Sequence, residues 1–281
     1  MTGLKTLPAG QNWLNFDASA AADVDTLAAS FNAASPFSHI VMDDFYPTEV
    51  LQAVEKEFEA TGSAGWRDYN GTLQRKRGTA PNARLPPAAQ AYFDMLYSGP
   101  SIRFLTQLTG IEDLIPDPAL FGGGMHEVAA GGKFEVHVDF RTHPRTRLTN
   151  RLAVITYLNR DWTPEDGGSL ELWELDPPRK GASILPVFGR TIIMEQSTRA
   201  AHGLPKPVRE GRARRSIIAY FYTNGLNVAR PDDTLKTTYV VHSGYSLRQR
   251  AEFYTRRFMP PMVIDAIKAV DGKIRTRGPR R

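Results

Sequence analysis

The residues best able to do chemistry in this chain are a His-x-Asp pair and one distant histidine. His137 and Asp139 are separated by Val138, and His202 lies further along the chain. Together they offer two imidazoles and one carboxylate to one face of a metal ion, and they leave coordination positions open. That donor set is typical of non-haem Fe(II) sites that activate O₂. The set predicts a metal and a reaction class, but it does not predict a substrate.

The pair is expected to project from one face of a β-strand, because positions i and i+2 of a strand share a face. His137 and Asp139 then point into a barrel while Val138 points away. His202 follows an apolar run and is expected to begin a loop that leads to the last strand. A lone His-x-Asp is weak evidence, since polar residues at this spacing are also ordinary surface pairs.

Residues 116–225 carry the pattern of an antiparallel β core. Short apolar or alternating segments are separated by turns rich in Gly, Pro and Asp, and the last of these segments is Ser216 to Thr223. Many short strands without intervening helices favour a sandwich or jelly roll over an α/β sheet. The predicted fold is therefore mainly β with flanking helices.

Helices are predicted on both sides of this core, as support helices in residues 1–115 and as a helical extension with a basic tail in residues 226–281. No linker divides the chain, so a single domain over residues 1–281 is expected. The predicted helices lie at about residues 47–60, 86–97, 101–108, 246–257 and 262–270.

The composition excludes several classes of protein. The chain has 281 residues and no cysteine, which rules out a disulfide framework and thiolate catalysis and restricts metal ligands to N and O atoms. No run reaches the apolar length of a bilayer span, and residues 1–15 lack the pattern of a secretory signal. We therefore expect a cytoplasmic protein without a membrane partner.

The net charge of the chain is +5, and residues 273–281 account for all of it, because they contain five basic residues and no acid. Such a tail contacts nucleic acid or another polyanion in some proteins and is a solvated terminus in others. We favour the solvated terminus because no aromatic residues interleave with the charges. Nucleic acid is not an expected partner, and the oligomeric state is not readable from the sequence.

A basic residue before the last strand has a specific use. A 2-oxo acid that chelates the metal leaves its far carboxylate inside an apolar barrel, where a charge needs a partner. An arginine offers two parallel hydrogen bonds to that carboxylate. The candidates are Arg212, Arg214 and Arg215. We favour Arg214, which faces inward if Ser216 does, but the register with Arg215 inward stays open.

Taken together, these segments resemble the Fe(II)/2-oxoglutarate-dependent dioxygenases, specifically their prolyl 4-hydroxylase-like branch, over about residues 37–223. The resemblance rests on His39 to Tyr46, His137-Val138-Asp139, Ile155 to Asn159, Gly167 to Leu172, His202 to Pro205 and Arg214-Arg215-Ser216. It implies a double-stranded β-helix, a jelly-roll core like that of the cupins. It also implies an iron centre on the His-Asp-His set and 2-oxoglutarate held by Arg214 and Tyr157.

The resemblance further implies Fe(II), 2-oxoglutarate and O₂ as reactants, and stimulation by ascorbate. The expected reaction hydroxylates an unactivated C–H bond and releases succinate and CO₂, with no catalytic side chain beyond the metal ligands. Asp139 favours hydroxylation, since family members that halogenate usually lack this carboxylate. One departure is that Arg214 lies twelve residues after His202, farther than this branch usually shows, so the choice of arginine stays open.

The pattern does not reveal the substrate, and a peptidyl residue, a free amino acid and a small metabolite all stay open. His126 and Arg141 are the candidates for its pocket, against the simpler roles of a hydrogen-bonded barrel residue and a solvated charge. The alternative function is a catalytically silent β-barrel that binds a partner through its basic C-terminal tail. The intact His-Asp-His set favours the enzyme.

Overall fold

The computed structural model describes residues 24–60, 65–225, 237–242 and 244–258 of the chain. The predicted helix at 262–270 and the basic tail at 273–281 lie outside these described residues, and the single domain stays a prediction. The described helices are α1 (Val24–Ala33), α2 (Thr48–Ala60), α3 (Pro87–Leu96), α4 (Gly99–Thr109) and α5 (Leu247–Phe258). None of them is long and apolar enough to cross a membrane.

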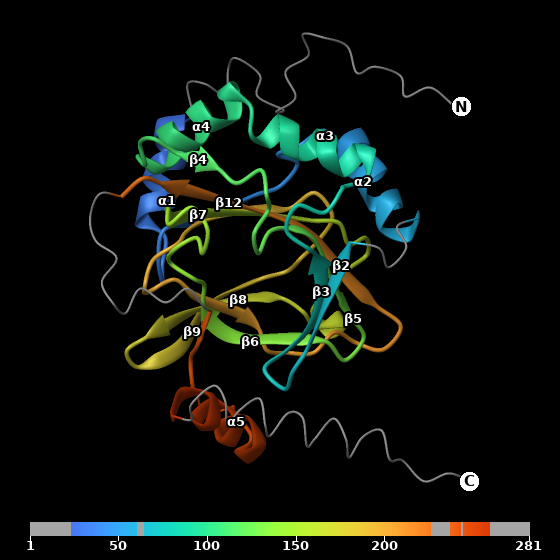
Figure 1. Cartoon of the computed structure of the whole chain (residues 1–281), viewed down its shortest axis with the longest axis vertical. Coiled ribbons are helices and arrows are strands. Elements are labelled where there is room, and N and C mark those ends of the chain that lie inside the picture. The colour runs from blue at the N-terminus through green and yellow to red at the C-terminus, as the bar shows by residue number, and fades with distance from the viewer. Residues whose placement is uncertain (1–23, 61–64, 226–236, 243, 259–281) are drawn as a thin grey trace.

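Thirteen strands of the described residues join in one antiparallel sheet that curves around an interior (Figure 1). The main path runs β1-β10-β7-β12-β5-β3-β6-β11-β8-β9, with β2 added to β3, β4 to β12 and β13 to β6. The strands are β1 (His39–Met42), β2 (Trp66–Asn70), β3 (Gln74–Thr79), β4 (Ile115–Pro116), β5 (Gly124–Ala129), β6 (Lys133–Val138), β7 (Thr149–Tyr157), β8 (Leu170–Leu175), β9 (Pro178–Ile184), β10 (Thr191–Glu195), β11 (Ala201–Leu204), β12 (Ala213–Thr223) and β13 (Thr238–Tyr239).

Strands β7 and β12 are apolar on both faces because each face packs against a different layer. Helices α1–α4 cover their outer face (Figure 1), where Val154 and Phe221 join the helical core around Phe93. Their inner face holds a second core that includes Ile155 and Tyr220. The strand alternation therefore turns the even-numbered residues of β12 toward the interior.

The predicted fold, a mainly β jelly roll with flanking helices, is confirmed. The predicted helices that fall on described residues are present as α2, α3, α4 and α5. One prediction was wrong: His202 lies inside strand β11 rather than in a loop, paired with His137 of β6 and Leu172 of β8. Strand β11 has only four residues and no alternation to reveal it, so its partners define it.

Sequence reasoning also missed the β2–β3 hairpin, which lies inside the region predicted as support helices. Its strands read Trp-Arg-Asp-Tyr-Asn and Gln-Arg-Lys-Arg-Gly-Thr, which are charged and lack apolar alternation. Strand β3 is held by long-range pairing, with Gly78 against His126 of β5 and Gln74 against Phe134 of β6. The hairpin therefore exists because the barrel offers it two edges, not because of a local pattern.

Candidate active site

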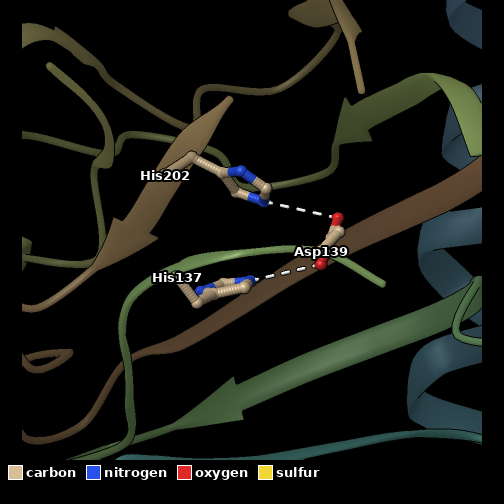
Figure 2. A group of neighbouring side chains, drawn as sticks. All are labelled: His137, Asp139 and His202. Atoms are coloured by element: carbon tan, nitrogen blue, oxygen red, sulfur yellow. Dashed lines mark ion pairs between the residues drawn. The ribbon is translucent and has the colours of Figure 1, made fainter. Parts of the chain in front are cut away.

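The His-Asp-His set converges at one end of β6. His137 is in β6, Asp139 directly follows that strand, and His202 comes from the neighbouring β11. The His137 Nε2 lies 3.3 Å from Asp139 Oδ1, and the His202 Nε2 lies 3.5 Å from Asp139 Oδ2 (Figure 2). The three ligand atoms all lie within 4.8 Å of one another. This compact arrangement comes from residues more than sixty positions apart in the chain.

Backbone carbonyls orient both imidazoles. The Nδ1–H of His137 donates to the Glu135 carbonyl at 2.7 Å, and that of His202 donates to the Ala200 carbonyl at 2.9 Å. Because a carbonyl only accepts, each Nδ1 carries a proton, and Nε2 is the nitrogen of each ring that faces Asp139. The buried His137 Nε2 has no hydrogen-bond partner. A cation between two such nitrogens and a carboxylate would satisfy all three groups, so the donor set fits Fe(II).

The protonation states suit a metal site. Burial lowers the pKa of His202 to about 4, against the opposing pull of Asp139, so its imidazole is neutral at pH 7. Burial raises the pKa of Asp139, but His202, His137 and the Tyr220 hydroxyl outweigh burial and hold this pKa below its usual range. That hydroxyl donates to Asp139 Oδ2 at 3.0 Å. The carboxylate therefore stays ionised, as a ligand must.

The set opens into a cavity of about 370 Å³ that Arg214 also lines. Arg214 is only 4% exposed, its Nε donates to the Gly168 carbonyl at 2.7 Å, and its guanidinium lies 4.8 Å from the centre of the Tyr157 ring. No carboxylate of the described residues pairs with it. A buried guanidinium without an ion-pair partner, beside the buried Ser216 hydroxyl, which has no hydrogen-bond partner, fits the far carboxylate of 2-oxoglutarate.

The structure separates the three candidate arginines. Arg215 turns outward, where its Nε lies 3.0 Å from Glu127 Oε2. Arg212 lies over Trp162 and pairs with Asp166 at 3.3 Å. Of the three, only Arg214 lines the cavity.

Tyr157 does not itself line the cavity but packs behind the Arg214 guanidinium. Its hydroxyl is buried and has no hydrogen-bond partner. Burial raises the pKa of Tyr157 against the opposing charge of Arg214, so the phenol is neutral. Its ring therefore supports the guanidinium.

The two pocket candidates have different locations. His126 lines the cavity, and its Nε2–H donates to the Gly123 carbonyl at 3.0 Å. Burial lowers its pKa to about 3, so the imidazole is neutral. Arg141 does not line the cavity, because its guanidinium donates to the carbonyls of Asn150 and Gln196 and ties loop ends together. The expectation for Arg141 is corrected on this point.

Two further segments that sequence reasoning missed also line the cavity. The β2–β3 hairpin contributes Arg67, Tyr69, Gln74 and Lys76, and the short β13 region contributes Tyr239 with its neighbour Thr237. The only sequence signal in the hairpin is its run of basic residues, which is equally typical of a solvated surface.

The comparisons with known proteins agree with this geometry. Residues 123–222 match the family model described as the 2OG-Fe(II) oxygenase superfamily. Among curated relatives, prolyl 3-hydroxylase OGFOD1 of Xenopus laevis is 31% identical over 85 residues, which are 29% of this chain and 16% of the relative. The Mus musculus protein of the same name is 24% identical over 201 residues, or 70% of this chain and 34% of the relative. The matched part of the chain thus spans about a third or less of each of these relatives.

Two solved structures share the fold. A Pseudomonas putida prolyl-4-hydroxylase superposes with a TM-score of 0.52 at 20% identity and covers 71% of this chain and 100% of its own. A Trichoplax adhaerens prolyl hydroxylase, solved with a peptide fragment of hypoxia inducible factor, gives 0.52 at 13% identity, with 74% and 94% covered. The family name contains Fe(II), predicted from the donor set, and 2-oxoglutarate, which the resemblance implied. The β core at residues 123–222 is thus the part of the chain that matches the 2OG-Fe(II) oxygenase superfamily.

Proposed function

We propose that this protein is an Fe(II)- and 2-oxoglutarate-dependent dioxygenase that hydroxylates an unactivated C–H bond of a peptidyl residue, an amino acid or a small metabolite. One oxygen atom of O₂ enters the substrate as a hydroxyl group, and the other enters succinate while CO₂ leaves. The observation that carries the proposal is the meeting of two imidazoles and one ionised carboxylate within 4.8 Å, in the cavity that Arg214 also lines without an ion-pair partner among the described residues.

The side chains bind and orient the reactants. His137, Asp139 and His202 would hold Fe(II), and Arg214 would pair with the far carboxylate of 2-oxoglutarate. Fe(II) with bound 2-oxoglutarate would activate O₂, the oxidant that breaks the C–H bond. The apolar residues Ile155, Leu170 and others of the lining exclude water from the oxidising centre. No protein acid or base is needed at the C–H bond.

The decisive experiment measures succinate formed from 2-oxoglutarate in air with added Fe(II) and ascorbate. The substrate panel begins with prolyl peptides, because prolyl hydroxylases are among the similar proteins, and continues with free amino acids. Wild-type protein is expected to form succinate only with iron. His137→Ala should form none, whereas His39→Ala, a histidine of β1 outside the cavity, should keep the wild-type rate.

Absence of Fe(II) binding, together with absence of iron-dependent succinate for every member of the panel, would refute the oxygenase proposal. That result would favour the alternative of a β-barrel that only binds a partner. Equal activity of His137→Ala and wild type would show that the metal is held elsewhere.

A further inference from the structure

One wall of the cavity is formed by the hairpin β2–β3, here called the hairpin wall and consisting of Arg67, Tyr69, Gln74 and Lys76. Tyr69 and Lys76 are direct partners across the hairpin. This wall lies outside residues 123–222, the range of the family match. None of its residues has a role in the proposed binding of Fe(II) or 2-oxoglutarate.

Lys76 brings a positive charge close to the candidate metal centre. Its Nζ lies 4.1 Å from the centre of the Phe134 ring and 5.7 Å from that of Tyr69. The Phe134 ring in turn stacks on the imidazole of His137, with 3.7 Å between ring centres. The ammonium is therefore one aromatic ring away from a candidate metal ligand.

No carboxylate of the described residues forms an ion pair with Lys76. Its neighbours are the faces of two aromatic rings, which attract a cation but do not neutralise it. Burial lowers the pKa of Lys76 to about 8 while Asp139 opposes that shift, so the group is still charged at pH 7. A half-buried charge left unpaired in a cavity indicates a partner that arrives with a ligand.

The charges of the cavity lead to the same conclusion, if the proposed function holds. Among the described residues, its lining contains three cationic side chains, Arg67, Lys76 and Arg214, and a single carboxylate, Asp139. The two positive charges of Fe(II) balance the two negative charges of 2-oxoglutarate, and the negative charge of Asp139 balances the positive charge of Arg214. The cation that remains nearest to the centre is Lys76, with Arg67 beside it, 5.3 Å from the Tyr69 ring.

We propose that Lys76 is an anion subsite for the substrate, so that this oxygenase acts on a molecule that carries a carboxylate near the oxidised C–H bond. Tyr69 and Phe134 hold the ammonium between their rings, and Arg67 attracts the anion at the exposed rim. The inference rests on the proposed function and names its substrate class. A free carboxylic acid and an acidic or C-terminal residue of a peptide both supply this chemistry.

The test measures binding rather than turnover. Protein loaded with Zn(II) and 2-oxoglutarate is titrated by calorimetry with matched pairs of probes. One arm uses N-acetylated proline, leucine and lysine, each as the free acid and as the amide. The other arm uses the peptide amides Gly-Pro-Glu and Gly-Pro-Gln. The first arm reports a free acid as the source of the carboxylate, and the second reports an acidic side chain of a peptide.

The proteins compared are wild type, Lys76→Met, Lys76→Arg and the control Lys180→Met, a lysine of β9 outside the cavity. Wild type should bind the carboxylate of at least one pair about tenfold more tightly than the amide, because a charge-assisted hydrogen bond is lost in the amide. Lys76→Met should lose that preference, Lys76→Arg should retain most of it, and Lys180→Met should match wild type. The affinity for 2-oxoglutarate should stay within about twofold in Lys76→Met.

The subsite would be overturned by the absence of a preference for the carboxylate in every wild-type pair, or by a preference that Lys76→Met retains. A loss of about tenfold in 2-oxoglutarate affinity in Lys76→Met would also overturn it, because Lys76 would then serve the cosubstrate. If wild type forms iron-dependent succinate but shows no preference for the carboxylate, the subsite is contradicted and the proposed reaction is not. If wild type prefers the carboxylate but forms no succinate, the proposed reaction is contradicted and the anion site is not.

Discussion

Two walls of the same cavity carry a positive charge, and they hold it in opposite ways. The deep wall, formed by Arg214 and Ser216 with Tyr157 packed behind the guanidinium, is buried, and a hydrogen bond to the Gly168 carbonyl fixes the guanidinium. The hairpin wall is half-buried or exposed, and its ammonium rests on aromatic faces. A fixed guanidinium suits one planar carboxylate in one pose, whereas an ammonium on a flexible stem accepts several poses.

This difference assigns the two walls different partners. The deep wall lies within residues 123–222 and carries the features expected for 2-oxoglutarate, the reactant common to the family. The hairpin wall comes from a segment before that range and is built around a looser charge. 2-Oxoglutarate, which the family shares, and the substrate, which is specific to this protein, would thus be bound by separate parts of the chain. The predictions below test that separation.

The largest effect is expected from Asp139→Ala, which removes the anionic ligand between the two walls. Metal affinity and iron-dependent succinate should each fall on the order of 1000-fold or more, because two neutral imidazoles alone hold Fe(II) weakly. Chelator competition measures the metal affinity. Asp94→Ala, an exposed carboxylate on α3, should leave both quantities unchanged. A variant that keeps the wild-type metal affinity would place the metal elsewhere.

Arg214→Met should affect the deep wall alone. Removing the buried partner of a carboxylate should weaken 2-oxoglutarate binding about 100-fold, while the hairpin wall keeps its preference for carboxylate probes. Calorimetry of the Zn(II)-loaded protein measures both. The matched control is Arg215→Met, whose guanidinium pairs with Glu127 outside the cavity. Equal losses in the two variants would contradict the assignment of Arg214.

Tyr220→Phe should weaken the metal site by about tenfold, because outer partners of a metal ligand typically contribute 10- to 100-fold in affinity. The variant loses the hydroxyl that donates to Asp139 Oδ2. That hydrogen bond lowers the pKa of Asp139, so without it the loss of metal at low pH should begin at a higher pH. Tyr222→Phe on the same strand is the control, since its hydroxyl has no hydrogen-bond partner. Identical metal affinities against pH in both variants would argue against this role.

The smallest effect is a pH dependence confined to the hairpin wall. Burial lowers the pKa of Lys76 to about 8, so the affinity for a carboxylate probe should be full at pH 7 and fall about tenfold by pH 9 as the ammonium loses its proton. Nearby His126 and His202 have pKa values of about 3 and 4 and do not titrate in this range. Lys76→Arg should keep its affinity to pH 9. A wild-type affinity that is flat with pH would show that Lys76 does not contact the anion.

The predicted candidate ligands depend on local features of the sequence. The spacing of His137 and Asp139 places both on one face of a strand, because strand parity is a property of neighbouring residues. The β pattern of residues 116–225 was also sufficient to predict an antiparallel sandwich or jelly roll, and the family resemblance then indicated the jelly roll. In contrast, the choice of arginine stayed open. Alternation divides the residues of β12 into two sets but does not say which set faces the interior, and that is decided by the register of β12 against β7 and β5.

The sequence by itself therefore determined the donor set, the class of fold and the kind of cosubstrate. Only the tertiary structure decided that Arg214 rather than Arg212 or Arg215 enters the cavity, and that Lys76 reaches it at all. The physical reason is the distance along the chain between the residues that interact. A period of two is encoded by residues side by side, whereas the position of β3 depends on hydrogen bonds to β5 and β6, whose residues lie far along the chain.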